Sequence, residues 1–278
     1  MKKIKIIALA LIIPLVLSIA ACKSDKAEKA AQKAAREAYQ LYTAALEKTN
    51  GQTDITSSQK VAADMTINIG KQKVSMRTAV MTDSKIKNYH KEDMLVEVHQ
   101  SQTVSGSGQL QTSRIDLFSD KTNLYFSVDN DPYTVVSRDS AQAKQLNDIL
   151  DSMTGNSDPG LKEEMFKGAQ IVTEEGGARR IELSLTDEQM KEMVKDNVDS
   201  SLAAMKGIGA VDIEYDLSDV EYSVVIDPNG FLTEVRMSCV MNMDMTVQGQ
   251  KATSTSAISA TSKILDVGKA VTITIPKV

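Results

Sequence analysis

Residues 231–247 carry the pattern that most constrains the fold. Odd positions read Phe, Thr, Val, Met, Cys, Met, Met, Met, Val, while even positions from 232 to 248 read Leu, Glu, Arg, Ser, Val, Asn, Asp, Thr, Gln. An alternation with period two is typical of a strand with one buried face. Such a strand would run for about 55–60 Å, well beyond the usual length. A strand this long must coil, so the pattern predicts a strongly curved sheet.

Further strand patterns lie on both sides of this segment. They cover residues 61–69 and 74–80, runs near 94–104, 109–118, 122–128, 133–137 and 221–226, a Ser/Thr/Ala-rich run at 251–265, and a short run at 271–275. Antiparallel neighbours joined by short turns are the simplest arrangement of such runs. We therefore expect an α+β fold built on a large antiparallel sheet.

A helical period replaces the strand period in three places. Residues 27–50 form an Ala-rich stripe that ends at Asn50-Gly51, and shorter amphipathic patterns predict inserted helices at about 140–153 and 187–206. Thr186 and Gln189 match a capping box at the start of the last helix. We expect the second half of the first helix to pack on the body and its first half to stand more free.

The first 21 residues have the layout of a secretory signal peptide. Lys2, Lys3 and Lys5 precede an apolar run over 6–20. This run is shorter than the roughly 20 residues of a membrane span, and it contains Pro14. We therefore predict a cleaved signal over 1–21; a membrane span and an ordinary secreted protein with an incidental cysteine are the alternatives.

Ile19-Ala20-Ala21-Cys22 resembles a bacterial lipobox very closely. The resemblance implies that signal peptidase recognises Ile19, Ala20 and Ala21, and that Cys22 becomes a diacylglyceryl thioether at the start of the mature chain. We expect residues 22–26 to be the lipidated cysteine and a short tether, with a single domain over 27–278. The predicted location is the outer face of the cytoplasmic membrane, with that membrane as a partner.

The chain as a whole resembles a group of Gram-positive lipoproteins. The shared features are the lipobox, a short tether, an Ala-rich helix, Met- and Thr-rich hairpins, inserted helices and the terminal Ile273-Thr274-Ile275-Pro276. That group is similar in architecture to the LolA/LppX-like carriers. The resemblance implies an unclosed β-barrel whose concave face is covered by helices. Relatives with this architecture carry lipids or lipidated molecules in the concave cavity.

Composition excludes several classes of function. A formal charge of −5 argues against a nucleic-acid partner, and four Phe with no Trp make a sugar- or base-stacking site unexpected. After Cys22 only Cys239 remains, so no disulfide framework is possible and we predict a buried, inert thiol. Protein partners cannot be named from the sequence.

The predicted ligand site is an apolar cavity between the sheet and a helix. Met side chains are flexible and suit surfaces that accept varied apolar partners. The candidate residues are Met65, Ile67, Met190, Met193, Met237, Met241, Met243 and Met245. Two alternatives are a Met-rich core with no ligand and, more remotely, Cu(I) binding by Cys239 and the Met residues along the strand.

Nothing in the sequence predicts an enzyme, a cofactor or a metal centre. His90 and His99 are the only histidines: His90 lies in a polar run, and His99 falls on the polar side of a strand. HExxH, GxSxG, P-loop and CxxC motifs are absent. A hydrolase with two carboxylates stays open because it needs no local motif. We predict a lipid-binding lipoprotein first, a structural or accessory envelope lipoprotein second, and an enzyme third.

Overall fold

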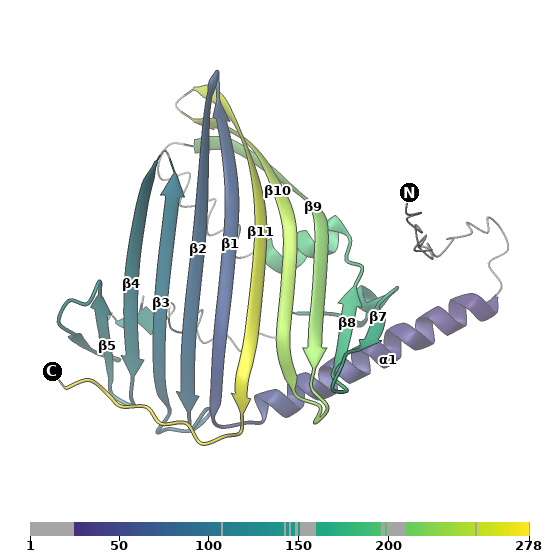
Figure 1. Ribbon diagram of the computed structural model, residues 1–278, viewed down its shortest axis with the longest axis horizontal. Coiled ribbons are helices and arrows are strands. Elements are labelled where there is room, and N and C mark those ends of the chain that lie inside the picture. The colour runs from purple at the N-terminus through teal and green to yellow at the C-terminus, as the bar shows by residue number, and fades with distance from the viewer. Residues whose placement is uncertain are drawn as a thin grey trace, which may run out of the picture.

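The computed structural model describes residues 25–106, 108–141, 143–144, 146–147, 150, 160–195, 198, 210–247 and 249–277 (Figure 1). Its strands form one antiparallel sheet of 11 strands in the order β6-β5-β4-β3-β2-β1-β11-β10-β9-β8-β7. The sheet has β6 at one edge and β7 at the other, so it is unclosed. The predicted large antiparallel sheet is thus confirmed.

The elements have the following bounds. They are α1 (Asp25–Asn50), β1 (Ile55–Ile69), β2 (Gln72–Lys87), β3 (Leu95–Gly106), β4 (Gln109–Ser119), β5 (Asn123–Val128), β6 (Thr134–Ser137), the 3-10 helix η1 (Glu163–Phe166), β7 (Gln170–Thr173), β8 (Arg179–Leu183), β9 (Ala210–Ile226), β10 (Leu232–Val247) and β11 (Gln250–Val267). Helical residues also occur within 141–150 and from 187 to 195.

The first and last strands pair at the centre of the sheet. Ile55 to Ile69 of β1 run antiparallel to β11, from Val267 back to Ala252. The hairpin β1–β2 therefore lies beside the hairpin β10–β11, and their tips lie together at the top of Figure 1. Gly70 and Gly249 occupy the tight turns with φ values of 57° and 78°, where a side chain would add strain.

The pairing register defines two faces of the sheet. Residues directly opposite one another share a face, so one row crosses five strands through Met76, Met65, Ser256, Met241 and Leu217. We call this the inner face, because Met241 and Leu217 belong to the cluster on which α1 and η1 pack. The residues between these rows form the outer face.

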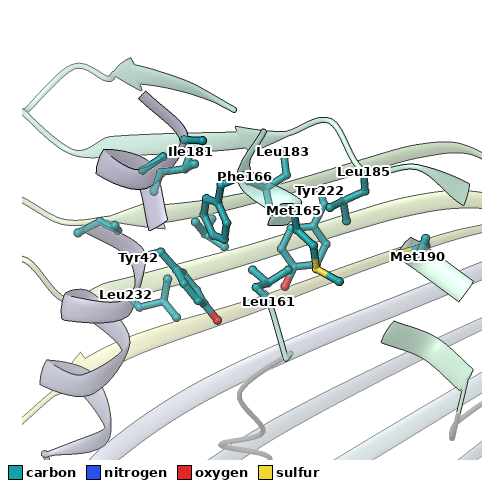
Figure 2. Close-up of a cluster of buried hydrophobic side chains, with 14 of the residues drawn as sticks. Tyr42, Leu161, Met165, Phe166, Ile181, Leu183, Leu185, Met190, Tyr222 and Leu232 are labelled. Carbon is teal, nitrogen blue, oxygen red and sulfur yellow. The ribbon is translucent and has the colours of Figure 1, made fainter. Parts of the chain in front are cut away.

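Two buried clusters cover the flanks of the inner face. The first lies between α1, η1, the 187–195 helix and β8–β10; Figure 2 shows Tyr42 of α1 facing Phe166 of η1, with ring centroids 5.6 Å apart. The second lies over β2–β6 and is closed by Ala143 and Leu150 of the 141–150 segment. The clusters therefore hold the two edges of the sheet under helices.

The N-terminal helix packs through its second half, as expected. Its buried positions are Ala35, Ala38, Tyr42, Ala45 and Thr49, which recur at helical spacing, whereas residues 28–34 are all exposed. In Figure 1 this first half of α1 extends past β7 and β8. No helix in the described part of the chain is long and apolar enough to cross a membrane.

Several predicted boundaries were wrong or incomplete. Residues 25 and 26, expected in the tether, already belong to α1, and the run at 271–275 is extended chain outside the sheet. The sequence interpretation missed β7, β8 and the first half of β9. The signal peptide, residues 22–24, and parts of the helices predicted at 140–153 and 187–206 lie outside the described residues.

The capping box at the start of the 187–195 helix is confirmed. The backbone N–H of Gln189 donates to Thr186 Oγ1 at 3.2 Å, and the Thr186 N–H donates to Gln189 Oε1 at 2.9 Å. Two N–H groups without a helical acceptor are satisfied in this way. The box fixes the point where the chain leaves β8 and turns over the inner face, which places Met190 against the sheet.

Candidate functional site

Six of the eight predicted cavity residues lie on one connected surface. Met190 is completely buried in the flank cluster, and Met193, Met237 and Met241 pack against it. Met243 and Met245 are buried nearer the hairpin tips with Ala252, where Met241 also joins them. Met190 therefore contributes to the packed core, and the accessible apolar residues of the inner face lie on other strands.

Met65 and Ile67 lie on the same face but outside these packed groups. Met65 is opposite Ser256, which in turn is opposite Met241 of β10; Ile67 is opposite Ser254, two residues further toward the tip. Both side chains are half-buried. The structure thus brings all eight candidates to the inner face and separates a buried group from an accessible one.

The accessible part of the inner face is an apolar band. We define it as Val61, Ala63, Met65 and Ile67 of β1 with Met76 and Val80 of β2, all half-buried. These residues are opposite one another in the register, Met65 to Met76 and Val61 to Val80. The main contacts of α1 are with η1, β9 and β10, whereas the apolar band lies on β1 and β2, on the other side of β11. Sequence reasoning had named only Met65 and Ile67 as cavity residues of this band.

A buried hydroxyl lies between the apolar band and the Met row of β10. Ser256 is 1% exposed, and its Oγ has no hydrogen-bond partner among the described residues. Leaving a buried polar atom unpaired costs free energy. Among the described residues, this hydroxyl is an unpaired polar group at the junction of Met65 and Met241.

Cys239 is a buried free thiol, as predicted. It lies in the flank cluster at 6% exposure, and burial raises the pKa of its thiol, which keeps it protonated at neutral pH. Met241, Met243 and Met245 follow it on the same face of β10. Within the described residues no group of three or more His, Cys, Asp or Glu side chains is arranged to hold a metal.

A polar groove of about 700 Å³ crosses β7–β11. Most of its lining side chains project from the outer face: Gln170, Arg180, Glu182, Ser184, Glu221, Ser223, Arg236, Ser238, Ser259 and Thr261. Both arginines of the groove lie against carboxylates: Arg180 Nε lies 3.2 Å from Glu182 Oε1, and Arg236 is paired with Glu234. The pKa of Glu234 lies below its usual range. Burial raises this pKa, but the hydrogen bonds and positive charges of Arg236 and Lys263 lower it by more.

The outer face also carries an ion-pair network that sequence reasoning missed. His99 Nδ1 lies 2.5 Å from Asp116 Oδ1, and its Nε2 lies 3.0 Å from Glu97 Oε1. Lys85 Nζ lies 2.8 Å from the same Glu97 Oε1, and Arg114 Nε lies 3.0 Å from the same Asp116 Oδ1. The signal in the sequence is the run of charged residues at alternate positions of β2, β3 and β4, which places them on one face of the sheet. The contacts Lys85–Glu97 and His99–Asp116 join neighbouring strands, while His99–Glu97 and Arg114–Asp116 lie within one strand, so the network ties β2, β3 and β4 together.

The family comparison gives one clear match. The model of a family of unknown function, DUF6612, matches residues 37–278. This chain belongs to the DUF6612 family. No curated protein matches it.

Solved structures match this DUF6612 chain only distantly. A beta-barrel-like protein of DUF1849 from Brucella abortus is 9% identical, with a TM-score of 0.21 over 75% of this chain and 98% of that one. A DUF1329 family protein from Desulfovibrio piger is 9% identical, with a TM-score of 0.19 over 83% of this chain and 90% of that one. With TM-scores this low, neither match enters the functional argument.

Proposed function

We propose that this DUF6612 protein is a membrane-anchored, extracytoplasmic lipoprotein that binds a lipid or another hydrophobic molecule on the inner face of its sheet. The observation that carries the proposal is the apolar band. Six neighbouring apolar side chains, Val61 to Ile67 at alternate positions with Met76 and Val80, stay half-exposed in the folded chain. A contiguous accessible apolar surface of this kind is typical of a ligand-binding or interaction site.

The surroundings of the band favour an acyl chain. Long, flexible Met side chains contribute much of its width, from Met76 through Met65 to Met241. Such side chains adapt to a chain of variable shape and make favourable contacts with it. The Ser256 hydroxyl lies buried beneath this row without a hydrogen-bond partner among the described residues, so it would become a partner for a single polar group on an otherwise apolar ligand once the Met side chains move aside.

The anchor supports the same class of ligand. A thioether lipid on Cys22 would hold the protein at the membrane surface, where acyl chains are the abundant hydrophobic molecules. The open, one-sheet architecture with helices on its inner face is also what the similarity to LolA/LppX-like carriers led us to expect. The proposed activity is binding and carriage without catalysis.

The test compares acyl-chain uptake by two matched double variants, one on each face of the sheet. Met76→Gln with Val80→Gln makes the apolar band polar, whereas Met81→Gln with Leu110→Gln makes the same type of change on the outer face. Met81 and Leu110 are 44% and 70% exposed, so their replacement leaves folding intact. We expect the inner-face variant to lose at least about tenfold in affinity for a fluorescent fatty acid, as two polar groups would contact the ligand.

Native mass spectrometry of the wild-type protein completes the test. Co-purifying acyl species are expected on the wild type and the outer-face variant and absent from the inner-face variant. An empty wild-type protein that also takes up no fluorescent lipid would contradict the proposal and favour a structural or accessory role. Uptake that survives in a folded inner-face variant would place the ligand elsewhere.

A further inference from the structure

The exposed half of α1 carries a basic stripe. We define it as Lys29, Lys33 and Arg36, which are four and three residues apart and therefore share a helix face. All three are exposed, and the Lys33 side chain is 79% exposed with one long ion pair to Glu37 at 3.7 Å. The helix packs on the body through other positions, beginning with Ala35 and Ala38. The basic stripe therefore makes no essential contact with the fold.

The stripe lines one side of a groove between α1 and η1. This groove has a volume of about 620 Å³ and is also lined by Lys167, Glu163 and Glu164. Its four cationic side chains outnumber its two carboxylates. The groove is therefore positive where it meets the free half of the helix.

The charge of the chain is divided unevenly along its length. Residues 23–36 contain five basic and two acidic side chains, a net charge of +3. Residues 37–278 contain 24 basic and 35 acidic side chains, a net charge of −11. An anionic surface would therefore attract the first segment and repel the rest.

The position of the stripe relative to Cys22 determines which surface it meets. Cys22 precedes the helix by three residues, a reach of at most about 11 Å. At 1.5 Å per residue, Lys29 lies about 6 Å and Arg36 about 17 Å from the start of α1. With Lys33 about 12 Å from that start, an anchor at Cys22 would hold Lys29 and Lys33 within about 17 and 23 Å of the lipid headgroups, roughly two to three Debye lengths.

We infer that the basic stripe of α1 docks on anionic lipid headgroups and, as a second contact beside the Cys22 anchor, orients the acidic body away from the membrane. This inference rests on the proposed lipid anchor. The two acyl chains of a diacylglyceryl anchor attach the protein to the bilayer, and three basic side chains close to an anionic leaflet add binding energy that fixes how the attached helix lies. The docked helix would hold the free edge of the sheet at a fixed angle to the bilayer.

The experiment is hydrogen–deuterium exchange on the full lipidated protein in vesicles. Intact mass first establishes whether Cys22 carries the lipid, so that failure of the anchor is seen separately from failure of the docking. Exchange over residues 25–36 is then compared between vesicles with half phosphatidylglycerol and vesicles of phosphatidylcholine alone. We expect exchange at least about fivefold slower on the anionic vesicles, and loss of this difference at high salt.

Matched variants identify the residues responsible. Lys29→Gln, Lys33→Gln and Arg36→Gln together should remove the protection, whereas the same charge removed at the hairpin tips, by Lys71→Gln, Lys73→Gln and Lys251→Gln, should not. An unchanged unfolding midpoint in both variants confirms that the fold is intact. Equal exchange on the two vesicle types would overturn the inference. Protection by added polyphosphate on neutral vesicles, with none from anionic lipid, would also overturn it and assign the stripe to a soluble polyanion.

Discussion

The covered flank and the open centre of the inner face are built from the same strand pattern but differ in burial. On the flank, Ile181 of β8 and Val224 of β9 are completely buried in the cluster on which α1 and η1 pack. At the centre, Met65, Met76 and Val80 have equally apolar side chains and stay half-exposed. Apolar alternation therefore shows that a face avoids water without showing what covers it. The flank serves stability, and the centre is where the proposed ligand would bind.

The two regions also differ in whether their buried hydroxyls are hydrogen-bonded. On the flank, Thr49 Oγ1 donates to the Ala45 carbonyl at 2.8 Å and accepts from the Leu232 N–H at 2.9 Å. At the centre, the Ser256 hydroxyl is unpaired among the described residues. A satisfied hydroxyl stabilises one arrangement, while an unpaired one costs free energy until something binds it. The flank is thus complete without a ligand.

The largest expected difference between the regions is in the cost of truncating a methionine. Met190→Ala should lower the free energy of unfolding by about 2–5 kcal/mol, because it leaves a cavity in a closed core. Met76→Ala should cost less than about 1 kcal/mol, since its site is already open to water. Urea unfolding of both variants measures the difference. Equal losses would mean that the centre is as well packed as the flank, and the comparison would fail.

The next effect concerns the hydrogen bond between α1 and β10. Thr49→Val keeps the side-chain shape but leaves the buried Leu232 N–H without an acceptor, so we expect a loss of about 1–3 kcal/mol. Thr49→Ser keeps the hydroxyl and should lose clearly less. Chemical denaturation of the pair gives the comparison. Similar losses in both variants would assign the effect to the methyl group and its packing.

The sequence predicted the elements better than their pairing. The alternation over 231–247 matches β10, Leu232–Val247, to within one residue, because a side chain every second position is a local signal. The pairing of β1 with β11 joins residues such as Met65 and Ser256, nearly two hundred positions apart. No local pattern specifies such a partner, so the open centre between the two flanks could not be predicted.

The missed half of β9 has a specific physical cause. In the second half of β9 the inner-face residues have even numbers, as at Tyr222 and Val224. In the first half they have odd numbers: Leu217 lies opposite Met241, and Tyr215 lies opposite Met243. Asp219 lies at the register shift between these parts, with a φ of 52°. A residue inserted at a bulge reverses the phase of the alternation. No single period of two runs through the whole of β9, although each half alternates by itself.

The third effect concerns the base of the open centre and depends on pH. Asp54 Oδ2 accepts from the Val271 N–H at 3.0 Å, and its Oδ1 accepts from the Asn88 N–H at 3.2 Å. The bond from Val271, joined by that from Asn88 and by Lys87, lowers the pKa of Asp54 despite partial burial. The carboxylate thus contributes stability that is fully present above the pKa of the unfolded chain and is lost as pH falls through the lower folded pKa.

Asp54→Asn tests this contribution. Asparagine offers one acceptor oxygen in place of two, so at neutral pH the variant should lose about 1 kcal/mol. Below about pH 4 the difference from the wild type should shrink, because the wild-type carboxyl becomes protonated. Unfolding measured from pH 7 to pH 3 gives both curves. A difference that does not change with pH would show that the charge of Asp54 contributes nothing to the C-terminal attachment.

The smallest expected effect is the sharpest test of the open centre. Ser256 and Ser84 are both buried serines of the inner face, but Ser84 Oγ shares a hydrogen bond with Ser57 Oγ at 2.6 Å. Ser84→Ala should cost about 1 kcal/mol, whereas Ser256→Ala should change stability by less than about 0.5 kcal/mol. If Ser256→Ala is instead as costly, its hydroxyl is paired in the unliganded protein and cannot be the polar contact of the ligand. If stability is unchanged while acyl-chain affinity falls, the hydroxyl that the fold leaves unpaired is the one that the ligand uses.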